Sequence, residues 1–382
     1  MRLPKRRIRL QFDRGADLLP SGKRLSDGMS AAASVGNTLW LAHDETISIE
    51  TLRAEKPRTG AIRYADHRRF DLQDFIALPA LPADRRRGPI AEADIEGIAI
   101  RDGYLWIAGS HSAVRGPLTQ PTGPKAIAEL AHVRRDGNRF LLARIPMQES
   151  AEGPLLVSEF RASDGRTRRA ARLPGGRKHD ALTRLLRTDP HLAPFLSIPS
   201  KDNGFDIEGL AAAPGGRLFL GLRGPVIDGW ACVLELLVTE HSVRKSDLVL
   251  RKFPSAKASA PHSNRYRKHF LDLGGAGIRD LCFAGRDLLI LAGPPMRGEG
   301  KARVHQWKSA LAARKDSMIG QRTLPKLLEL PYGATNNHPE GITIVAQQGR
   351  RALLMALYDS FEKDSRVGEA AMWATLHTLV LR

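Results

Sequence analysis

Residues 206–225 read DIEGLAAAPGGRLFLGLRGP, and this stretch decides the fold prediction. An apolar run follows Asp206, a Gly-Gly pair interrupts it, and a second apolar run leads to Arg223. Two apolar runs joined by glycines indicate a β-hairpin, because the turn needs positive φ angles that glycine adopts without strain. The stretch is therefore predicted to form two antiparallel strands.

The same pattern recurs along the chain. Further copies open at Asp94, Gly277 and His338, and a weaker copy opens at Met29. Their second strands begin 66, 113, 71 and 64 residues apart. Strand-like runs follow several copies, so each module is expected to hold four short antiparallel strands, as in a propeller blade. We predict an all-β fold over residues 1–382, a single closed β-propeller with six blades favoured and five or seven left open.

Two features extend this prediction. The longest interval between copies is expected to contain a short helical insertion over residues 174–197, with room for a sixth blade near 155–173. Residues 7–12 form a strand-like run without a hairpin partner. Because an open sheet leaves edges bare, we expect this strand to complete the last blade beside residues 372–381.

Three glutamates occupy the same position of the repeat: Glu96, Glu208 and Glu340, each followed by a glycine. In the copy that opens at Gly277, Arg279 and Asp280 stand in the corresponding place. Two readings remain open. Each Glu could accept hydrogen bonds from the neighbouring blade, or the three carboxylates could converge on a cation, since hard divalent ions such as calcium take several oxygen ligands.

Other polar groups follow the second strands and extend the candidate site. The possible metal ligands are Glu96, Glu208, Glu340, Asp44 and Asp359. His111 or His338 could act as a general base, because histidine titrates near neutral pH. Arg223 and Arg279 could stabilise developing negative charge or pair with the acids.

Composition limits the partners that we expect. The formal net charge is +18, but the basic residues are spread along the chain and aromatic residues make up only 6%. Specific nucleic-acid binding would concentrate the charge and interleave it with aromatic side chains, so it is not expected. The sequence contains no apolar run long enough for a membrane span or a secretory signal, which predicts a cytoplasmic protein. We expect a monomer.

The chain resembles a bacterial family catalogued as domain of unknown function 3616, over about residues 27–382. The resemblance rests on Asp-Ile-Glu-Gly-(Ile/Leu)-Ala, Leu-Gly-Leu-Arg-Gly-Pro, Gly-Ile-Arg-Asp-Leu and His-Pro-Glu-Gly-Ile. It implies a propeller-like fold and carries no established activity. Phytase-like propellers with esterase-like activity are more distantly similar in the Glu-Gly-(Ile/Leu)-Ala strand. Gluconolactonase-like hydrolases place a metal-binding Glu before Gly-Pro, where this chain has Gly-Ile or Gly-Leu.

Two functions follow as hypotheses. The favoured one is a binding or scaffold module with a polar axial site, whose partner is a small polar ligand or a protein. The alternative is a metal-dependent hydrolase of a phosphoester, ester or lactone at the channel mouth, in which a bound cation activates water. No known catalytic motif occurs in the chain, so whether it is an enzyme stays open.

Overall fold

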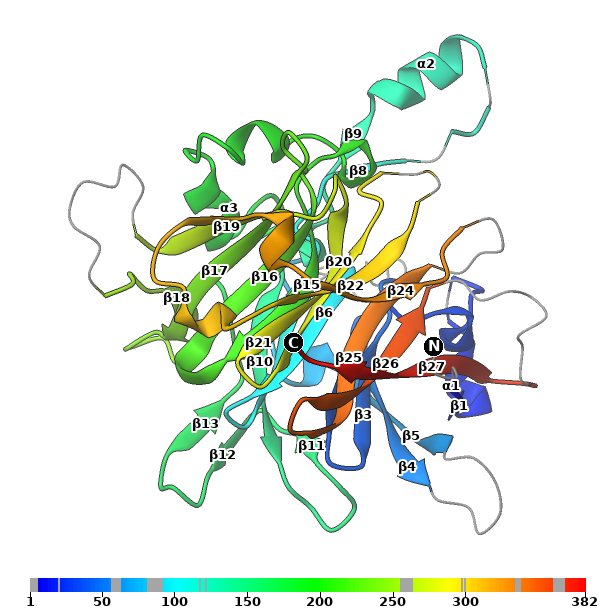
Figure 1. Ribbon diagram of the computed structural model, residues 1–382, viewed down its shortest axis with the longest axis vertical. Helices are drawn as coiled ribbons and strands as arrows, with labels where there is room; N and C mark the ends of the chain where they lie inside the picture. The colour runs from blue at the N-terminus through cyan, green and yellow to red at the C-terminus, as the bar shows by residue number, and fades with distance from the viewer. Residues whose placement is uncertain are drawn as a thin grey trace.

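The computed structural model describes residues 6–19, 21–55, 63–80, 92–116, 118–120, 122–254, 264–296, 298, 300–333, 338–359 and 368–382. These residues form mainly short antiparallel strands, arranged in groups of about four that fan around the middle of the molecule (Figure 1). The arrangement is propeller-like. An arm that carries helix α2 (Pro124–Ala131) extends away from the body (Figure 1).

One eight-stranded sheet contains both ends of the described chain. Its strands follow the order β2 (Ala31–Val35), β3 (Thr38–Ala42), β4 (Ser48–Glu55), β5 (Arg63–Asp71), β1 (Arg6–Gln11), β27 (Ala371–Val380), β26 (Arg351–Tyr358) and β25 (Pro339–Gln348). β1 pairs antiparallel with β27, from Arg6 opposite Leu376 to Gln11 opposite Ala371, and briefly parallel with β5. The sheet thus consists of two four-stranded units, the first and the fifth in chain order, and the fifth unit takes its outermost strand from the beginning of the chain.

Three further units lie between these two in sequence. The second unit contains β6 (Ile95–Arg101), β7 (Tyr104–Gly109), β10 (Leu142–Gln148), β11 (Leu155–Leu156) and β14 (Ala171–Arg172). The third contains β15 (Asp206–Ala213), β16 (Arg217–Gly224), β17 (Trp230–Glu240), β18 (Leu248–Leu250), β19 (Tyr266–Asp272) and β23 (Ser317–Ile319). The fourth contains β20 (Gly277–Ala284), β21 (Asp287–Gly293), β22 (Ala302–Trp307) and β24 (Lys326–Leu330).

The stretch 155–173, where a sixth blade was expected, forms no separate four-stranded sheet among the described residues. β12 (Glu159–Arg161) and β13 (Thr167–Arg169) make a small hairpin, and β11 and β14 both attach to β10. The physical reason is composition: the hairpin consists largely of charged residues and has little apolar surface to bury.

Helical segments lie in the connections. Within residues 174–202, helix α3 (Ala181–Leu186) is followed by 3-10 turns at Ala193–Phe195 and Ser200–Asp202. Asp180 caps α3 by accepting a hydrogen bond from the Thr183 backbone N–H at 2.8 Å. The remaining helical elements are α1 (Arg14–Asp17) and 3-10 turns at Leu25–Asp27, Leu72–Asp74, Gly137–Arg139, Pro214–Gly216, Ala310–Ala312 and Gln321–Thr323. A two-stranded pair, β8 (Val114–Arg115) with β9 (Val133–Arg134), lies at the base of the arm.

The first strand of each unit contacts the first strands of its neighbours, in the order β2, β6, β15, β20, β25 and back to β2. We call these five the inner strands. The hydroxyl of Ser30, just before β2, donates to the Ile95 carbonyl of β6 at 2.6 Å. Close approach explains the glycine of the repeated motif: a Cβ on Gly97 would lie 2.6 Å from the Cβ of Leu210 on β15.

Hydrophobic clusters fill the spaces between neighbouring units. One cluster joins β7 to β15 and β16 and includes Trp106, Leu210 and Leu220. Four others join the remaining neighbouring pairs, including the first and last units, where Leu41 and Met355 share a cluster. The core is therefore divided among the interfaces between sheets. Within the described ranges, no helix has the length and apolar character that a membrane crossing requires.

Candidate functional site

The repeated glutamates are the bulged residues of the inner strands. In the pairing of β6 with β7 the register jumps from Ile95 to Gly97, which leaves Glu96 without a partner in the ladder. The same jump skips the corresponding residue in three other inner strands: Glu208 in β15, Arg279 in β20 and Glu340 in β25. Because a bulge re-aims a side chain, the four residues leave their sheets at equivalent points.

Arg279 connects the glutamates of both neighbouring strands. Its Nε lies 3.0 Å from Glu208 Oε2, and its Nη2 contacts Glu340 Oε1. Arg223, at the end of β16, adds a second guanidinium, with Nη1 2.6 Å from Glu208 Oε1 and Nη2 2.9 Å from Asp206 Oδ2. Side-chain exposure is only 5% for Glu208 and 8% for Arg279, so these ion pairs are buried.

A third arginine lies one unit away. Arg139 Nη1 is 2.5 Å from Asp94 Oδ2, and Arg139 Nη2 is 2.7 Å from Glu92 Oε1. Its charge also acts on Asp206. Asp206 and Glu208 contact the same guanidinium of Arg223, and the charge of Asp94 acts on Glu96, so each Asp lies close to the Glu two residues further along the chain.

We call the whole group the carboxylate–arginine cluster. Its members lie where the inner strands begin and the second strands end: Asp44, Asp94, Glu96, Asp206, Glu208, Glu340, Asp359, Arg139, Arg223 and Arg279. The structure thus brings together all five predicted metal-ligand candidates and both predicted arginines.

Burial and mutual repulsion change the acidity of the cluster. Burial raises the pKa of Glu96 well above its ordinary value, and the charges of Asp94 and Glu208 add to the rise. Burial also raises the pKa of Asp206 to about 7, although Arg223 opposes this, and that of Asp94 to about 6. The pKa of Asp359 rises through burial and the nearby charge of Asp44. The pKa values of Asp94 and Asp206 therefore lie near neutral pH.

Glu96 and Asp359 differ from the other carboxyl groups. Glu208 and Glu340 are paired with arginine, and Asp44 Oδ1 lies 3.0 Å from His43 Nδ1. In contrast, neither the Glu96 nor the Asp359 carboxyl group has a hydrogen-bond or ion-pair partner within the described ranges. A carboxyl group of raised pKa without a partner can receive a ligand group.

The two predicted general bases lie differently. Both ring nitrogens of His111 are engaged, with Nδ1 2.8 Å from the Gly109 carbonyl and Nε2 2.9 Å from Asp180 Oδ2. Although burial lowers it, the Asp180 carboxylate raises the pKa of His111 above its ordinary value. His111 is therefore not available as a base for the cluster. The ring centroid of His338 lies 5.0 Å from that of Tyr332. The backbone carbonyl of His338 accepts a hydrogen bond from the Asp359 backbone N–H.

The predicted hydrogen bond between blades is found at Asp280 rather than at a glutamate. Asp280 stands where other inner strands have the motif glycine, and its Oδ2 accepts from the Ile342 backbone N–H of β25 at 2.7 Å. Sequence reasoning missed this role, and it also missed Asp94, Asp206 and Arg139. The Asp-x-Glu spacing was a usable signal for the two aspartates. Arg139 offered none, because it comes from a connection outside the repeat.

No group of three or more His, Cys, Asp or Glu side chains in the described part of the chain is arranged to hold a metal ion. The ion pairs give the reason. Arg223 and Arg279 occupy the Glu208 carboxylate, and Arg279 also contacts Glu340, so two of the three glutamates are already paired with guanidinium groups.

Fold and site together define a propeller-like protein with a buried carboxylate–arginine cluster at one end of its inner strands. The chain belongs to the family DUF3616, described as a protein of unknown function, whose model matches residues 28–375. No protein of curated function matches it.

Several solved structures are similar to the chain at low identity. They include glutaminyl cyclase from Myxococcus xanthus, with 9% identity and a TM-score of 0.38, covering 99% of this chain and 97% of that one. A Thermus thermophilus protein described as an oxidoreductase (glucose dehydrogenase) has 12% identity and a TM-score of 0.33, with coverages of 92% and 97%. Hydrazine synthase from Kuenenia stuttgartiensis has 8% identity and a TM-score of 0.31, with coverages of 94% and 88%.

Proposed function

We propose that this protein is a binding module that takes a small, positively charged polar ligand in the carboxylate–arginine cluster of a closed, five-bladed β-propeller. Five blades replace the six favoured from sequence spacing. The closed ring is supported by the contacts among the inner strands, which return from β25 to β2, and by a hydrophobic cluster in each interface between units.

The observation that carries the ligand proposal is the state of Glu96 and Asp359. Both carboxyl groups lack a partner among the described residues, and burial raises the pKa of each. Carboxyl groups outnumber guanidinium groups in the cluster. An ammonium or guanidinium group would supply the missing charge and donate hydrogen bonds to both carboxylates, which favours a cationic ligand over an anionic one.

The arginines support binding more than metal-dependent hydrolysis. A divalent cation would have to displace Arg279 from Glu208 and Glu340, which are the carboxylates expected to coordinate it. Arg279 and Arg223 instead preorganise the two glutamates beside the free carboxyl group of Glu96. The cationic ligand would thus enter a rigid setting and lose little of its affinity to ordering side chains.

The test is ligand-induced stabilisation. Putrescine and arginine are the cationic probes, succinate is the anionic one, and Ca²⁺, Mg²⁺ and Mn²⁺ test the hydrolase alternative. A ligand at one hundred times its Kd should raise the free energy of unfolding by about 2.7 kcal/mol. We expect stabilisation by a cationic probe that is lost in Glu96→Gln and kept in Glu159→Gln, an exposed glutamate paired with Arg169.

A second readout uses the pKa shifts. Cation binding requires ionised carboxylates, so affinity should rise with pH through neutrality and binding should release protons into the buffer. Stabilisation by divalent ions alone would overturn the binding proposal in favour of the hydrolase. Equal loss of stabilisation in Glu96→Gln and Glu159→Gln would place the ligand elsewhere.

A further inference from the structure

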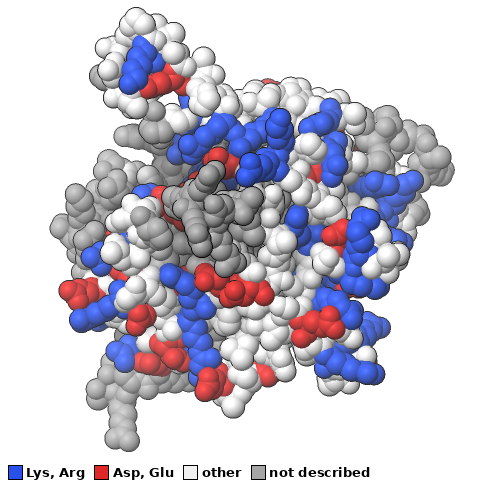
Figure 2. Space-filling model, turned by 180° about the vertical axis from the view of Figure 1, so that it is seen from behind, with Lys and Arg blue, Asp and Glu red and all other residues white. Residues whose placement is uncertain are grey.

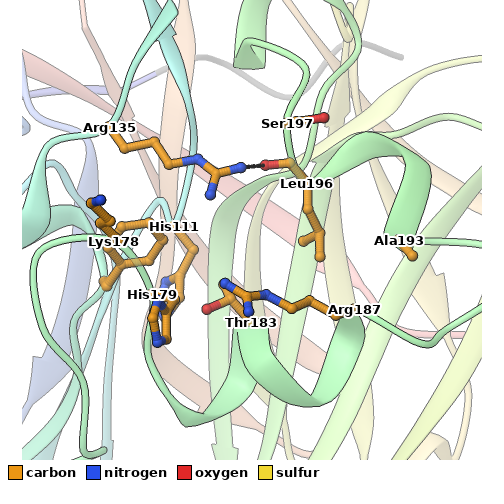
Figure 3. A pocket seen from close by; sticks show the side chains of 10 residues that line it. His111, Arg135, Lys178, His179, Thr183, Arg187, Ala193, Leu196 and Ser197 are labelled. Carbon is orange, nitrogen blue, oxygen red and sulfur yellow. Dashed lines mark hydrogen bonds between the residues drawn. The ribbon is translucent and has the colours of Figure 1, made fainter.

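A cavity of about 150 Å³ lies beside the helical insertion (Figure 3). Its lining comes from the end of the β6–β7 hairpin, the chain after β9, and the segment around α3: His111, Arg135, Phe140, Lys178, His179, Thr183, Arg187, Ala193, Leu196 and Ser197. Neither the fold nor the carboxylate–arginine cluster explains this cavity. Its lining contains no acidic residue.

The cavity is strongly basic. Arg135 and Arg187 extend their guanidinium groups into it from opposite sides (Figure 3). Arg135 Nη2 donates to the Leu196 carbonyl at 2.8 Å, which positions its guanidinium and leaves other N–H groups free. Lys178 and Arg187 have no hydrogen-bond or ion-pair partner within the described ranges. Because Arg135, Lys178 and Arg187 are exposed, water screens part of their mutual repulsion, and an anion between them would remove the rest.

A buried ring nitrogen lies beside this arrangement. The Nδ1 atom of His179 is inaccessible to water and has no hydrogen-bond partner. A buried polar atom left without a partner destabilises the protein by about 1–3 kcal/mol, so such an atom needs an explanation. Because water in the cavity does not reach this atom, the cationic side chains rather than His179 define a site for an anion.

The nearest carboxylate does not neutralise the cavity. Asp180 is fully buried, and its two oxygens face His111 Nε2 at 2.9 Å and the Thr183 backbone N–H at 2.8 Å. Asp180 is thus already paired with His111. Lys and Arg side chains also gather on the body next to the arm that carries α2, so the positive field extends beyond the cavity (Figure 2).

We propose that this cavity is an anion-binding site for an oxyanion of the phosphate class, either free phosphate or the phosphate group of a small ester. Planar guanidinium groups match phosphate oxygens with paired hydrogen bonds. The lining provides two guanidinium groups and an ammonium group, and no carboxylate among the described residues lines the cavity. The site is separate from the carboxylate–arginine cluster and takes a ligand of opposite charge.

The experiment measures binding to the full-length protein by calorimetry, at constant ionic strength in chloride buffer. The probes are inorganic phosphate, glycerol 3-phosphate and acetate. We expect saturable binding of a phosphate probe, weakened roughly tenfold or more in Arg187→Gln through loss of charge-assisted hydrogen bonds. Lys178→Gln should also weaken it. Arg286→Gln is the matched control, because Arg286 is exposed in the β20–β21 turn.

The outcomes separate the sources of the ligand. Tighter binding of inorganic phosphate supports free phosphate, and tighter binding of glycerol 3-phosphate supports an ester. Acetate binding as tightly as both phosphates, equal weakening in Arg286→Gln, or no binding by the unaltered protein would each overturn the proposal. Thermal unfolding without ligand checks that each variant is folded. Glu96→Gln should leave phosphate binding unchanged, which keeps this result independent of the proposed cation site.

Discussion

Asp280 joins two inner strands through its carboxylate: Oδ2 accepts from the Ile342 backbone N–H of β25 at 2.7 Å, while Oδ1 accepts from its own neighbour Leu281 at 2.7 Å. Both N–H groups are buried with the carboxylate. The other inner strands have glycine at this position or, in β2, follow a serine that makes a similar link. Asp280 is therefore expected to hold the fourth and fifth units in register.

Replacing Asp280 tests this link. Asp280→Ala leaves two buried N–H groups without acceptors and should lower the free energy of unfolding by about 2–4 kcal/mol. Urea denaturation measures the effect. Asp164→Ala is the control, because Asp164 is exposed in a turn and its removal should leave the unfolding curve almost unchanged. Equal stability of the two variants would show that the link contributes nothing.

Arg279 is expected to stabilise the protein through the carboxylates that it pairs. Arg279→Gln leaves Glu340 unpaired and removes one of two arginines from Glu208, so we expect a loss of about 3–5 kcal/mol, as for a broken buried ion pair. Arg303, which is one-third exposed and pairs with Glu329 on the surface, provides the comparison. Arg303→Gln should change stability little, since water screens that pair. A similar small change in Arg279→Gln would mean that the buried pairs are not formed.

The raised pKa of Asp206 predicts that the stability of the protein depends on pH. Its pKa is raised to about 7 in the folded protein, above the ordinary value of an unfolded chain. The folded state therefore binds more protons than the unfolded state between about pH 4 and 7. This contribution to stability is complete below about pH 4 and is lost as the pH rises to about 7. The stability of the unaltered protein relative to Asp206→Asn should fall across this window in urea titrations, and a constant difference would contradict the shift.

Because β6 and β15 approach closely at Gly97, a larger residue there should lower the stability of the protein. A Cβ there would lie 2.6 Å from the Leu210 Cβ and 3.0 Å from the Leu210 backbone nitrogen. Gly97→Ala should therefore destabilise the protein by about 1–3 kcal/mol, as overpacking does. Gly116 has no neighbour within 4 Å of such a Cβ, so Gly116→Ala is the control. Thermal melts compare the two, and a Gly97→Ala protein as stable as the control would place β6 and β15 further apart.

The local sequence determined the hairpins and the equivalence of Glu96, Glu208, Glu340 and Arg279, because alternation and turn chemistry act between residues close in the chain. The segments 7–12 and 372–381, expected to pair, overlap β1 (Arg6–Gln11) and β27 (Ala371–Val380), which are antiparallel neighbours. Local patterns could not show that strands within residues 155–173 would pair with β10. That pairing depends on the sheet edge and apolar surface that the rest of the second unit offers once it has assembled.

Only the tertiary structure decided which groups the repeated glutamates contact. The sequence left a cation and a neighbouring blade as alternatives, and the structure places Arg279 between Glu208 and Glu340. It also separates His111 from the cluster by pairing it with Asp180, 69 residues further along the chain. Charges interact through space, and burial changes the pKa of an ionisable group. The partners and pKa values of these side chains therefore follow from the assembly of the sheets rather than from the order of the residues.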